Sequence, residues 1–396
     1  MKSTPYIIVQ ASGLGTRMRH LTNNRPKALI SLNGEPLILR LMRLYPNTHF
    51  IVLGSYKFGV LDKYLKKYSP TNRLTVIESP GSTIGNNAGI SQALDSIPTN
   101  TPVMILWSDL YHKKPINFSK LKVTKNNYIG LSKTFYCRWR FRNNKLEERR
   151  SQSHGIAGVY IFTNKKQIID VPDTGEFCEY LQKKDIEFVP FSLCGILKEI
   201  GTLNKYTRAI NATPISRPFN EIRLTKSKVA KIPRDKQGND LAKIEAAWYQ
   251  KFADKNWDFL PKILKYKPLT MSRINGLPLY RYSFSSKKKL LILTKIIENP
   301  QAIHNSQKPI QGNFYQNNHE IYLDKTRRRL DSVADIIPHI NTKTLPINGE
   351  KVLNPYLNWR KVEKITTPLF TNTYVPIHGD LTFSNTLLIP AKTRCS

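Results

Sequence analysis

The stretch that decides the fold is YIIVQASGLGTR, residues 6–17. Its apolar start, residues 6–9, predicts a short buried strand, and a glycine-rich turn follows directly. Gly13 and Gly15 permit the backbone angles that bring amide N–H groups close to phosphate oxygens. A strand that runs into such a turn therefore predicts a phosphate-binding loop at the start of an α/β domain.

Two cations extend this pattern. Arg17 ends the turn, and Pro26 and Lys27 follow within NNRPKALISLNG, residues 23–34. The spacing places two positive side chains beside the expected phosphates. The sequence GxxxxGK[ST], which marks a P-loop, is missing, which argues against a P-loop. The alternative is a surface loop with incidental basic residues, but it does not explain why several positions agree in order and spacing.

A carboxylate follows where an open α/β sheet usually carries its chemistry. VMILW, residues 103–107, predicts a strand that leads to Asp109. Ligands of such sheets bind at the carboxyl ends of the strands, so Asp109 is well placed to hold Mg²⁺ on a triphosphate. The alternative is an aspartate that only caps the next turn.

Together these motifs resemble the nucleotidyltransferases that activate sugar 1-phosphates and phosphocholine. The signature of that family is a strand, then A-x-G-x-G-[ST]-R, then P-K, and the residues that match it are Ala11, Gly13, Gly15, Thr16, Arg17, Pro26 and Lys27. The resemblance covers about residues 1–210. It implies a Rossmann-like α/β domain whose mixed sheet has helices on both faces, with nucleotide bound by Ala11, Gly13, Gly15, Thr16 and Arg17.

The same resemblance implies a mechanism. EIGT, residues 199–202, stands where the family usually has D-x-G-T, so Glu199 is a longer substitute for the aspartate. Asp109, Glu199 and the nucleotide phosphates would then bind Mg²⁺ in its preferred octahedron. Arg17 and Lys27 would act in catalysis by stabilising the pyrophosphate that leaves as an acceptor phosphate attacks the α-phosphorus.

A later stretch of the sequence bears on which nucleotide is the donor and which phosphate is the acceptor. SPGSTIGNNAGISQALDSI, residues 79–97, predicts a turn-rich loop and a helix from about 88 to 94. Asn86 and Asn87 resemble the branch that uses CTP to activate phosphocholine, so we expect CTP as donor and both asparagines in nucleotide binding. HGIAGVYIF, residues 154–162, and EIGT resemble the sugar-phosphate branch instead. The acceptor therefore stays open, and the resemblance implies a role in making bacterial capsules or other surface glycans.

A second pattern begins after Pro214 and Pro218. NEIRLTKSKVAKI, residues 220–232, predicts two short strands joined by a turn, and DLAKIEAAWYQKF, residues 240–252, has the apolar spacing of a helix. Lys231 on the second strand and Glu245 on the helix could form the ion pair that orients a kinase lysine toward ATP phosphates. In a lysine-rich chain such a pair can also arise by chance.

HGDLTFSN, residues 378–385, favours the kinase interpretation. It resembles the H-G-D-x-x-x-x-N motif of aminoglycoside phosphotransferases and choline kinases. The resemblance implies that Asp380 is a catalytic base, Asn385 a magnesium ligand and His378 a structural residue, with Lys231 and Glu245 binding ATP. It implies an α+β protein-kinase-like domain over residues 211–396, with partly helical segments between about 250 and 370, such as WDFLPKIL and NPYLNWRKVEKI.

The last residues depart from that family. IPAKTRCS, residues 389–396, contains no acidic residue, whereas the family carries a second metal-binding aspartate soon after the asparagine. A single side-chain ligand would hold the metal poorly. We therefore expect an incomplete kinase-like domain that lacks its C-terminal end, through truncation or degeneration, and that has little or no kinase activity.

Composition limits the partners. The chain has 62 Lys and Arg against 28 Asp and Glu, a net charge of +34. The basic residues are spread along the whole chain and no nucleic-acid-binding motif is visible. The bias of an AT-rich genome toward lysine codons, together with anionic small substrates, therefore explains the charge better than specific nucleic-acid binding. The alternative is a non-catalytic basic binding protein that uses both domains as a scaffold. Cysteine spacing and the absence of a long apolar run predict a cytoplasmic protein with reduced thiols and no transmembrane segment.

Overall fold

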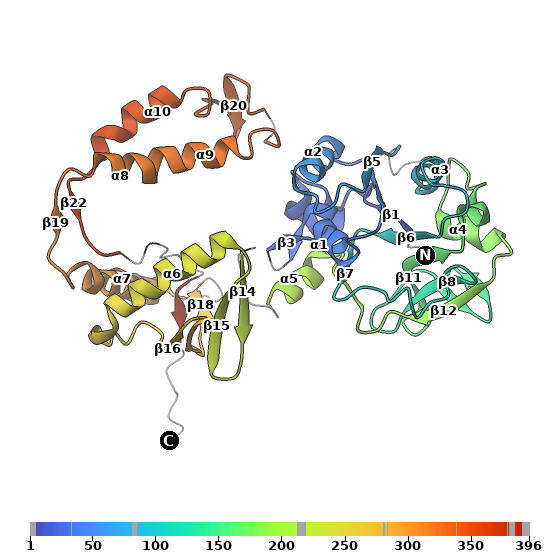
Figure 1. Cartoon of the computed structure of the whole chain (residues 1–396), viewed down its shortest axis with the longest axis horizontal. Helices are drawn as coiled ribbons and strands as arrows, with labels where there is room; N and C mark the ends of the chain where they lie inside the picture. The colour runs from blue at the N-terminus through green and yellow to red at the C-terminus, as the bar shows by residue number, and fades with distance from the viewer. Residues whose placement is uncertain are drawn as a thin grey trace. The chain divides into compact units, whose positions relative to one another are not determined.

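The computed structural model of the chain describes residues 5–32, 34–80, 85–211, 219–279, 282, 284–337, 339–377, 379 and 385–389 (Figure 1). The chain divides into two compact units, Met1–Pro218 and Phe219–Ser396. The sequence predicts a domain boundary near residue 210, a few residues before this division. His378 and Asp380, the first and third residues of the kinase-like motif, lie outside the described residues.

Nine strands of the described part of the first unit form one mixed sheet (Figure 1). Their bounds are β1 Tyr6–Gln10, β4 Phe50–Gly54, β5 Leu74–Glu78, β6 Val103–Trp107, β8 Asn127–Ser132, β9 Arg140–Arg142, β10 Lys145–Glu147, β11 Gly155–Phe162 and β12 Phe188–Ser192. The strands β5, β4, β1 and β6 are parallel neighbours in that order. β11 runs antiparallel to β6, and β8, β12, β9 and β10 extend the sheet beyond β11.

Helices cover both faces of this sheet. Their bounds are α1 Leu37–Leu44, α2 Phe58–Tyr68, α3 Asn87–Asp95 and α4 Phe177–Lys183. Side chains alternate along β1, so Ile7 and Val9 pack into the core beneath α1 and α2, whereas Ile8 packs into the core beneath α3 and α4. This confirms the Rossmann-like α/β architecture, with its mixed sheet, that the sequence predicted for the first half.

A two-stranded ribbon stands at the carboxyl edge of the parallel strands. β7, Leu110–His112, follows β6 almost directly and pairs antiparallel with β13, Leu197–Glu199. Glu199 lies opposite Leu110 in this pair. α5, Leu203–Asn211, follows β13. The ribbon thus brings the EIGT segment beside the end of β6, although the two are far apart in the sequence. A second short ribbon joins β2, Ser31–Leu32, to β3, Glu35–Pro36.

The second unit begins with a four-stranded antiparallel sheet and a helix. The bounds are β14 Asn220–Leu224, β15 Lys228–Pro233, β16 Ile263–Tyr266, β17 Leu269–Ser272 and α6 Lys236–Lys251, and the strand order is β14-β15-β17-β16. α6 packs against β15. Its N-cap is Asp235, whose Oδ1 accepts a 2.7 Å hydrogen bond from the Gly238 N–H. The two strands and the helix predicted here are therefore present.

Four further α-helices and three strand pairs follow in the described part of this unit. They are α7 Ser286–His304, α8 Tyr315–His319, α9 Lys325–Asp331, α10 Trp359–Thr366, β18 Leu277–Pro278 with β23 Leu387–Leu388, β19 Ile310–Gln311 with β22 Thr373–Tyr374, and β20 Thr344–Ile347 with β21 Glu350–Leu353. NPYLNWRKVEKI contains α10, as expected. WDFLPKIL instead leads into β16, because Pro261 disfavours a continuous helix and Ile263 pairs with β17. Among the described helices, none combines the length and apolar character needed to cross a lipid bilayer.

Candidate active site

The glycine loop after β1 has two different kinds of glycine. Gly15 has a φ of +68°, and a Cβ there would lie 2.8 Å from Thr22 Cγ2. Thr22 also holds the turn, because its hydroxyl donates to the Gly15 carbonyl at 3.1 Å. A Cβ at Gly13 would meet no heavy atom within 4 Å. Gly15 therefore shapes the loop, whereas Gly13 keeps its outer surface open for a ligand.

The other residues of the signature differ in exposure. Ala11 is buried in the core and its N–H donates to the Leu53 carbonyl at 2.8 Å, so it anchors the start of the loop. Thr16 is exposed at the beginning of a 3₁₀ helix, Thr16–Thr22. The Arg17 side chain is 68% exposed. The accessible part of the signature is thus its second half, from Gly13 to Arg17.

Parallel pairing of β1 with β6 brings the glycine loop beside Asp109. Gln10 and Trp107 lie opposite each other at the ends of these strands. Lys27 Nζ lies 2.9 Å from Asp109 Oδ2, and Arg17 Nη2 lies 4.0 Å from the same oxygen. Lys27 is only 12% exposed and Asp109 19% exposed, so this ion pair is shielded from water. Both predicted cations therefore stand at the predicted carboxylate.

Glu199 is the second carboxylate of the site. Its Oε1 accepts a 2.8 Å hydrogen bond from the Gly201 N–H, and its Oε2 forms an ion pair with Lys205. Its side chain is 12% exposed. Lys205 lies in the first turn of α5, so β13 and α5 together fix the orientation of this carboxylate.

Gly201 shows how closely these groups converge. A Cβ at that position would lie 2.6 Å from Glu199 Oε1, 2.7 Å from Asp109 Oδ2 and 2.9 Å from Lys27 Nζ. Two carboxylate oxygens and one ammonium group therefore surround one small space, which only glycine leaves open. Carboxylate oxygens are the ligands that Mg²⁺ prefers, and the pair fits such an ion. No cluster of three or more His, Cys, Asp or Glu side chains that could hold a metal occurs among the described residues, so phosphates and water would supply the other ligands.

The two asparagines predicted to bind nucleotide make hydrogen bonds inside the protein. Asn86 Oδ1 accepts from the Phe177 N–H at 2.7 Å, and Asn87 Nδ2 donates to the Thr174 carbonyl at 2.9 Å. Asn87 is 1% exposed, and its Oδ1 has no hydrogen-bond partner in the described part of the chain. In this arrangement they connect the start of α3 to the segment before α4, and their role toward a nucleotide stays a prediction.

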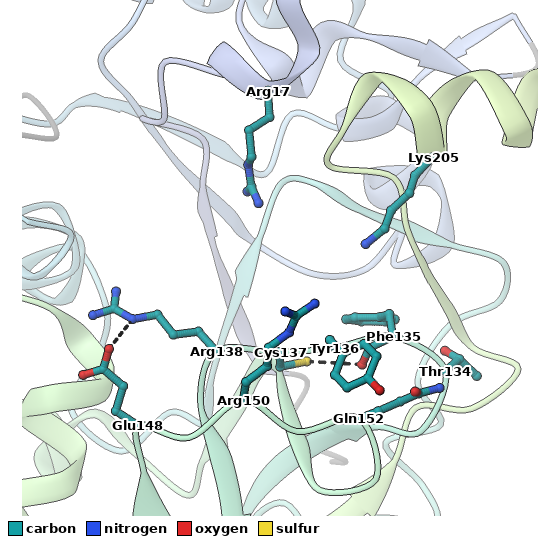
Figure 2. A pocket seen from close by; sticks show the side chains of 10 residues that line it. All are labelled: Arg17, Thr134, Phe135, Tyr136, Cys137, Arg138, Glu148, Arg150, Gln152 and Lys205. Atoms are coloured by element: carbon teal, nitrogen blue, oxygen red, sulfur yellow. Dashed lines mark hydrogen bonds and ion pairs between the residues drawn. The ribbon is translucent and has the colours of Figure 1, made fainter.

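A cavity of about 710 Å³ lies beside the two carboxylates (Figure 2). Its lining residues are Arg17, Thr134, Phe135, Tyr136, Cys137, Arg138, Glu148, Arg150, Gln152 and Lys205. Figure 2 shows Arg17 and Lys205 reaching toward the same space from two separate segments. Because Arg17 also approaches Asp109 and Lys205 pairs with Glu199, the cavity adjoins the carboxylate site.

The thiol in this cavity, that of Cys137, is held in its protonated form by its surroundings. Burial raises the pKa of Cys137 to about 12, and the nearby Glu199 carboxylate acts in the same direction. A thiol with such a pKa is protonated at neutral pH, whereas the reactive form of cysteine is the thiolate. The chemistry of the site therefore rests on its carboxylates and cations.

The kinase-like residues of the second unit are only partly described. Lys231 on β15 and Glu245 on α6 form the expected ion pair, with both side chains about one-third exposed. Asn385 precedes β23, and Asp380 lies outside the described residues. The structure thus shows the predicted Lys231–Glu245 ion pair, whereas the role of these two residues in binding ATP stays a prediction.

Three residues of the first site were missed by the sequence reasoning. Gly201 could have been found, because it is the glycine of EIGT. Lys205 stands six residues after Glu199, and this spacing alone does not predict a contact. The two side chains meet because β13 ends at Glu199 and α5 begins shortly after it. Arg150 lies among several basic residues in the sequence, and only the fold places it in the cavity.

Comparison with known protein families finds a match in the first unit. Residues 7–120 match the sequence profile of the MobA-like NTP transferase domain. The match supports an N-terminal NTP transferase domain over these residues, which include Arg17, Lys27 and Asp109. All matched residues lie in the first unit.

The curated relatives are nucleotidyltransferases that use different bases. A mannose-1-phosphate guanyltransferase from Pichia angusta is 30% identical over 116 residues, which are 28% of this chain and 31% of that protein. A probable glucose-1-phosphate cytidylyltransferase from Bacillus subtilis (strain 168) is 33% identical over 78 residues, 19% of this chain and 31% of that protein. The chain thus spans about a third of the length of these relatives.

A search of solved structures also found similar chains. The structure of HddC from Yersinia pseudotuberculosis complexed with GMP-PN covers 53% of this chain and 99% of its own, at 22% sequence identity and a TM-score of 0.44.

Proposed function

We propose that the first unit is a Mg²⁺-dependent nucleotidyltransferase. It transfers the nucleotidyl group of an NTP, with CTP as the first candidate, to a phosphorylated sugar or small alcohol. The bond from the acceptor phosphate oxygen to the α-phosphorus forms as the α–β phosphoanhydride bond breaks, and pyrophosphate leaves. The observation that carries this proposal is the convergence of Asp109, Glu199 and Lys27 on the space left open by Gly201.

Each residue of the site has a distinct task. Asp109 and Glu199 would hold Mg²⁺, which when bound offsets the negative charge of the phosphates. Lys27, paired with Asp109 in this structure, would exchange that carboxylate for a phosphate oxygen as the metal binds. Arg17, exposed at the end of the glycine loop, is free to move onto the leaving pyrophosphate. The loop amides beside Gly13 would bind the phosphates closest to the backbone.

The test is pyrophosphate release by the full chain with Mg²⁺. CTP, GTP, UTP, ATP and dTTP are offered one at a time with glucose 1-phosphate, mannose 1-phosphate or phosphocholine. Release that requires both substrates, and that Asp109→Asn abolishes while the exposed-site control Asp95→Asn does not, supports the proposal and identifies the donor. If no combination releases pyrophosphate, a non-catalytic basic binding protein becomes the better account.

A second proposal concerns the second unit. The Lys231–Glu245 ion pair, set between a strand of an antiparallel sheet and the helix packed on it, supports an ATP-binding, kinase-like unit. Calorimetric binding of ATP with Mg²⁺ tests it. ATP should bind more weakly to Lys231→Met than to the wild type, and Lys228→Met on the same strand is the matched control. Equal affinity for all three proteins would contradict an ATP-binding role for Lys231.

A further inference from the structure

Most of the charged side chains that line the cavity beside the carboxylates are positive. Four of its lining residues are cations and one, Glu148, is an acid. Glu148 Oε1 accepts a 2.6 Å hydrogen bond from Arg138 Nε, so that acid is already neutralised. Arg17 and Lys205 stand beside Asp109 and Glu199. Arg150 is left as a cation with no carboxylate partner among the described residues.

Arg150 also belongs to a second hollow. This hollow has a volume of about 620 Å³ and is lined by Lys133, Tyr136, Arg150, Ser151, Gln152, Ser153 and His154. Tyr136, Arg150 and Gln152 line both spaces, so the two hollows lie next to each other. No carboxylate lines the second hollow, and Lys133 has no acidic partner in the described ranges. Its remaining polar groups are hydroxyls, an amide and an imidazole.

Tyr136 lines both hollows, and the Arg150 guanidinium already covers one face of its ring. The Arg150 guanidinium lies 4.7 Å from the centre of the Tyr136 ring. An electron-rich ring face could otherwise receive a quaternary ammonium group. With a guanidinium over the ring and the acid of the cavity paired to Arg138, a cationic acceptor such as phosphocholine would meet repulsion here.

We infer that the acceptor is doubly anionic: besides the phosphate that reacts, it carries a second anionic group, a carboxylate or a phosphate, which Arg150 and Lys133 bind in the second hollow. This inference rests on the proposed function, since it assigns the acceptor of that site. Arg150 would give bidentate hydrogen bonds to either group. Lys133 would add charge, and the serine hydroxyls and Gln152 would supply further hydrogen bonds to it.

The test compares three acceptors built on one sugar. Glucose 1-phosphate has no second charge, glucuronic acid 1-phosphate adds a carboxylate at C6, and glucose 1,6-bisphosphate adds a phosphate there. Two quantities are measured on the full chain: kcat/KM for pyrophosphate release with the preferred NTP, and the calorimetric Kd of each acceptor. A charged hydrogen-bonded contact predicts a preference of about tenfold or more for at least one dianionic sugar.

Variants of the lining residues test which side chains bind the second anionic group. Arg150→Gln and Lys133→Gln should each reduce that preference toward one, whereas Arg149→Gln, the neighbouring arginine outside both hollows, should keep it. Preference for the glucuronic acid compound alone identifies a carboxylate, and preference for the bisphosphate alone identifies a phosphate. Equal Kd values for all three sugars, or a preference that Arg150→Gln leaves intact, would overturn the inference. Pyrophosphate release that is absent with every acceptor would instead count against the transferase itself, while the Kd values still decide the second contact.

Discussion

At the scale of single residues, a substitution at Gly201 should lower enzymatic activity and leave the stability of the fold unchanged. A methyl group there would lie within 3 Å of Glu199 Oε1, Asp109 Oδ2 and Lys27 Nζ. These atoms are the ends of flexible side chains, so they can move aside without disturbing the fold. We expect Gly201→Ala to lower the rate of pyrophosphate release by about 100-fold or more, with a melting temperature close to that of the wild type. Full activity of this variant would contradict the proposed metal position.

His112 makes stability depend on pH. It is 2% exposed, both ring nitrogens lack hydrogen-bond partners among the described residues, and burial lowers its pKa from 6.5 to about 3. Between these values the unfolded chain binds a proton that the folded chain does not. The titration of His112 therefore leaves stability unchanged above pH 6.5 and destabilises the fold as the pH falls below it, by about 1.4 kcal/mol per pH unit.

Urea unfolding at pH 7 and pH 5 measures this effect. The wild type should lose more stability between the two values than His112→Phe, which keeps the ring and removes the titration. An identical loss in both proteins would show that other groups cause the pH dependence.

At the scale of elements, the cap of α6 sets how firmly Glu245 is held. Asp235 accepts the Gly238 N–H at 2.7 Å, and loss of such a cap typically costs about 1 kcal/mol. Asp235→Ala should therefore raise hydrogen exchange of the α6 amides by about fivefold. Asp240→Ala, an exposed position within the same helix, is the control. Unchanged exchange in Asp235→Ala would mean that packing on β15 alone defines the start of the helix.

Elements also show what a sequence can predict. The strand over residues 103–107 and the helix over 88–94 were predicted because their apolar patterns are local, and they became β6 and α3. The pairing of β7 with β13 was not predicted. Each has three residues, and nothing in either short sequence specifies its partner. That ribbon brings Glu199 to Asp109. The two carboxylates could therefore be named from motifs, whereas their closeness, and the part that Lys205 and Arg150 play in the site, could not.

At the scale of the whole molecule, the charge of +34 is the dominant property. It predicts non-specific attraction to polyanions, which falls steeply with salt: for six to ten phosphate contacts, by roughly 10³- to 10⁵-fold between 50 and 200 mM. Fluorescence anisotropy with random-sequence duplex DNA measures it. Tight binding that persists at 200 mM salt, or that prefers one sequence, would favour the scaffold interpretation.

The most direct test of the central claim is a double-mutant cycle on pyrophosphate release, with Asp109→Asn, Glu199→Gln and the two combined, measured at saturating Mg²⁺. If both carboxylates hold one ion, each single variant should lose about 100-fold or more, and the double variant should lose little beyond the worse single one. If the losses simply multiply, or if either single variant keeps near wild-type activity, the two carboxylates do not act on one metal and the proposed site is wrong.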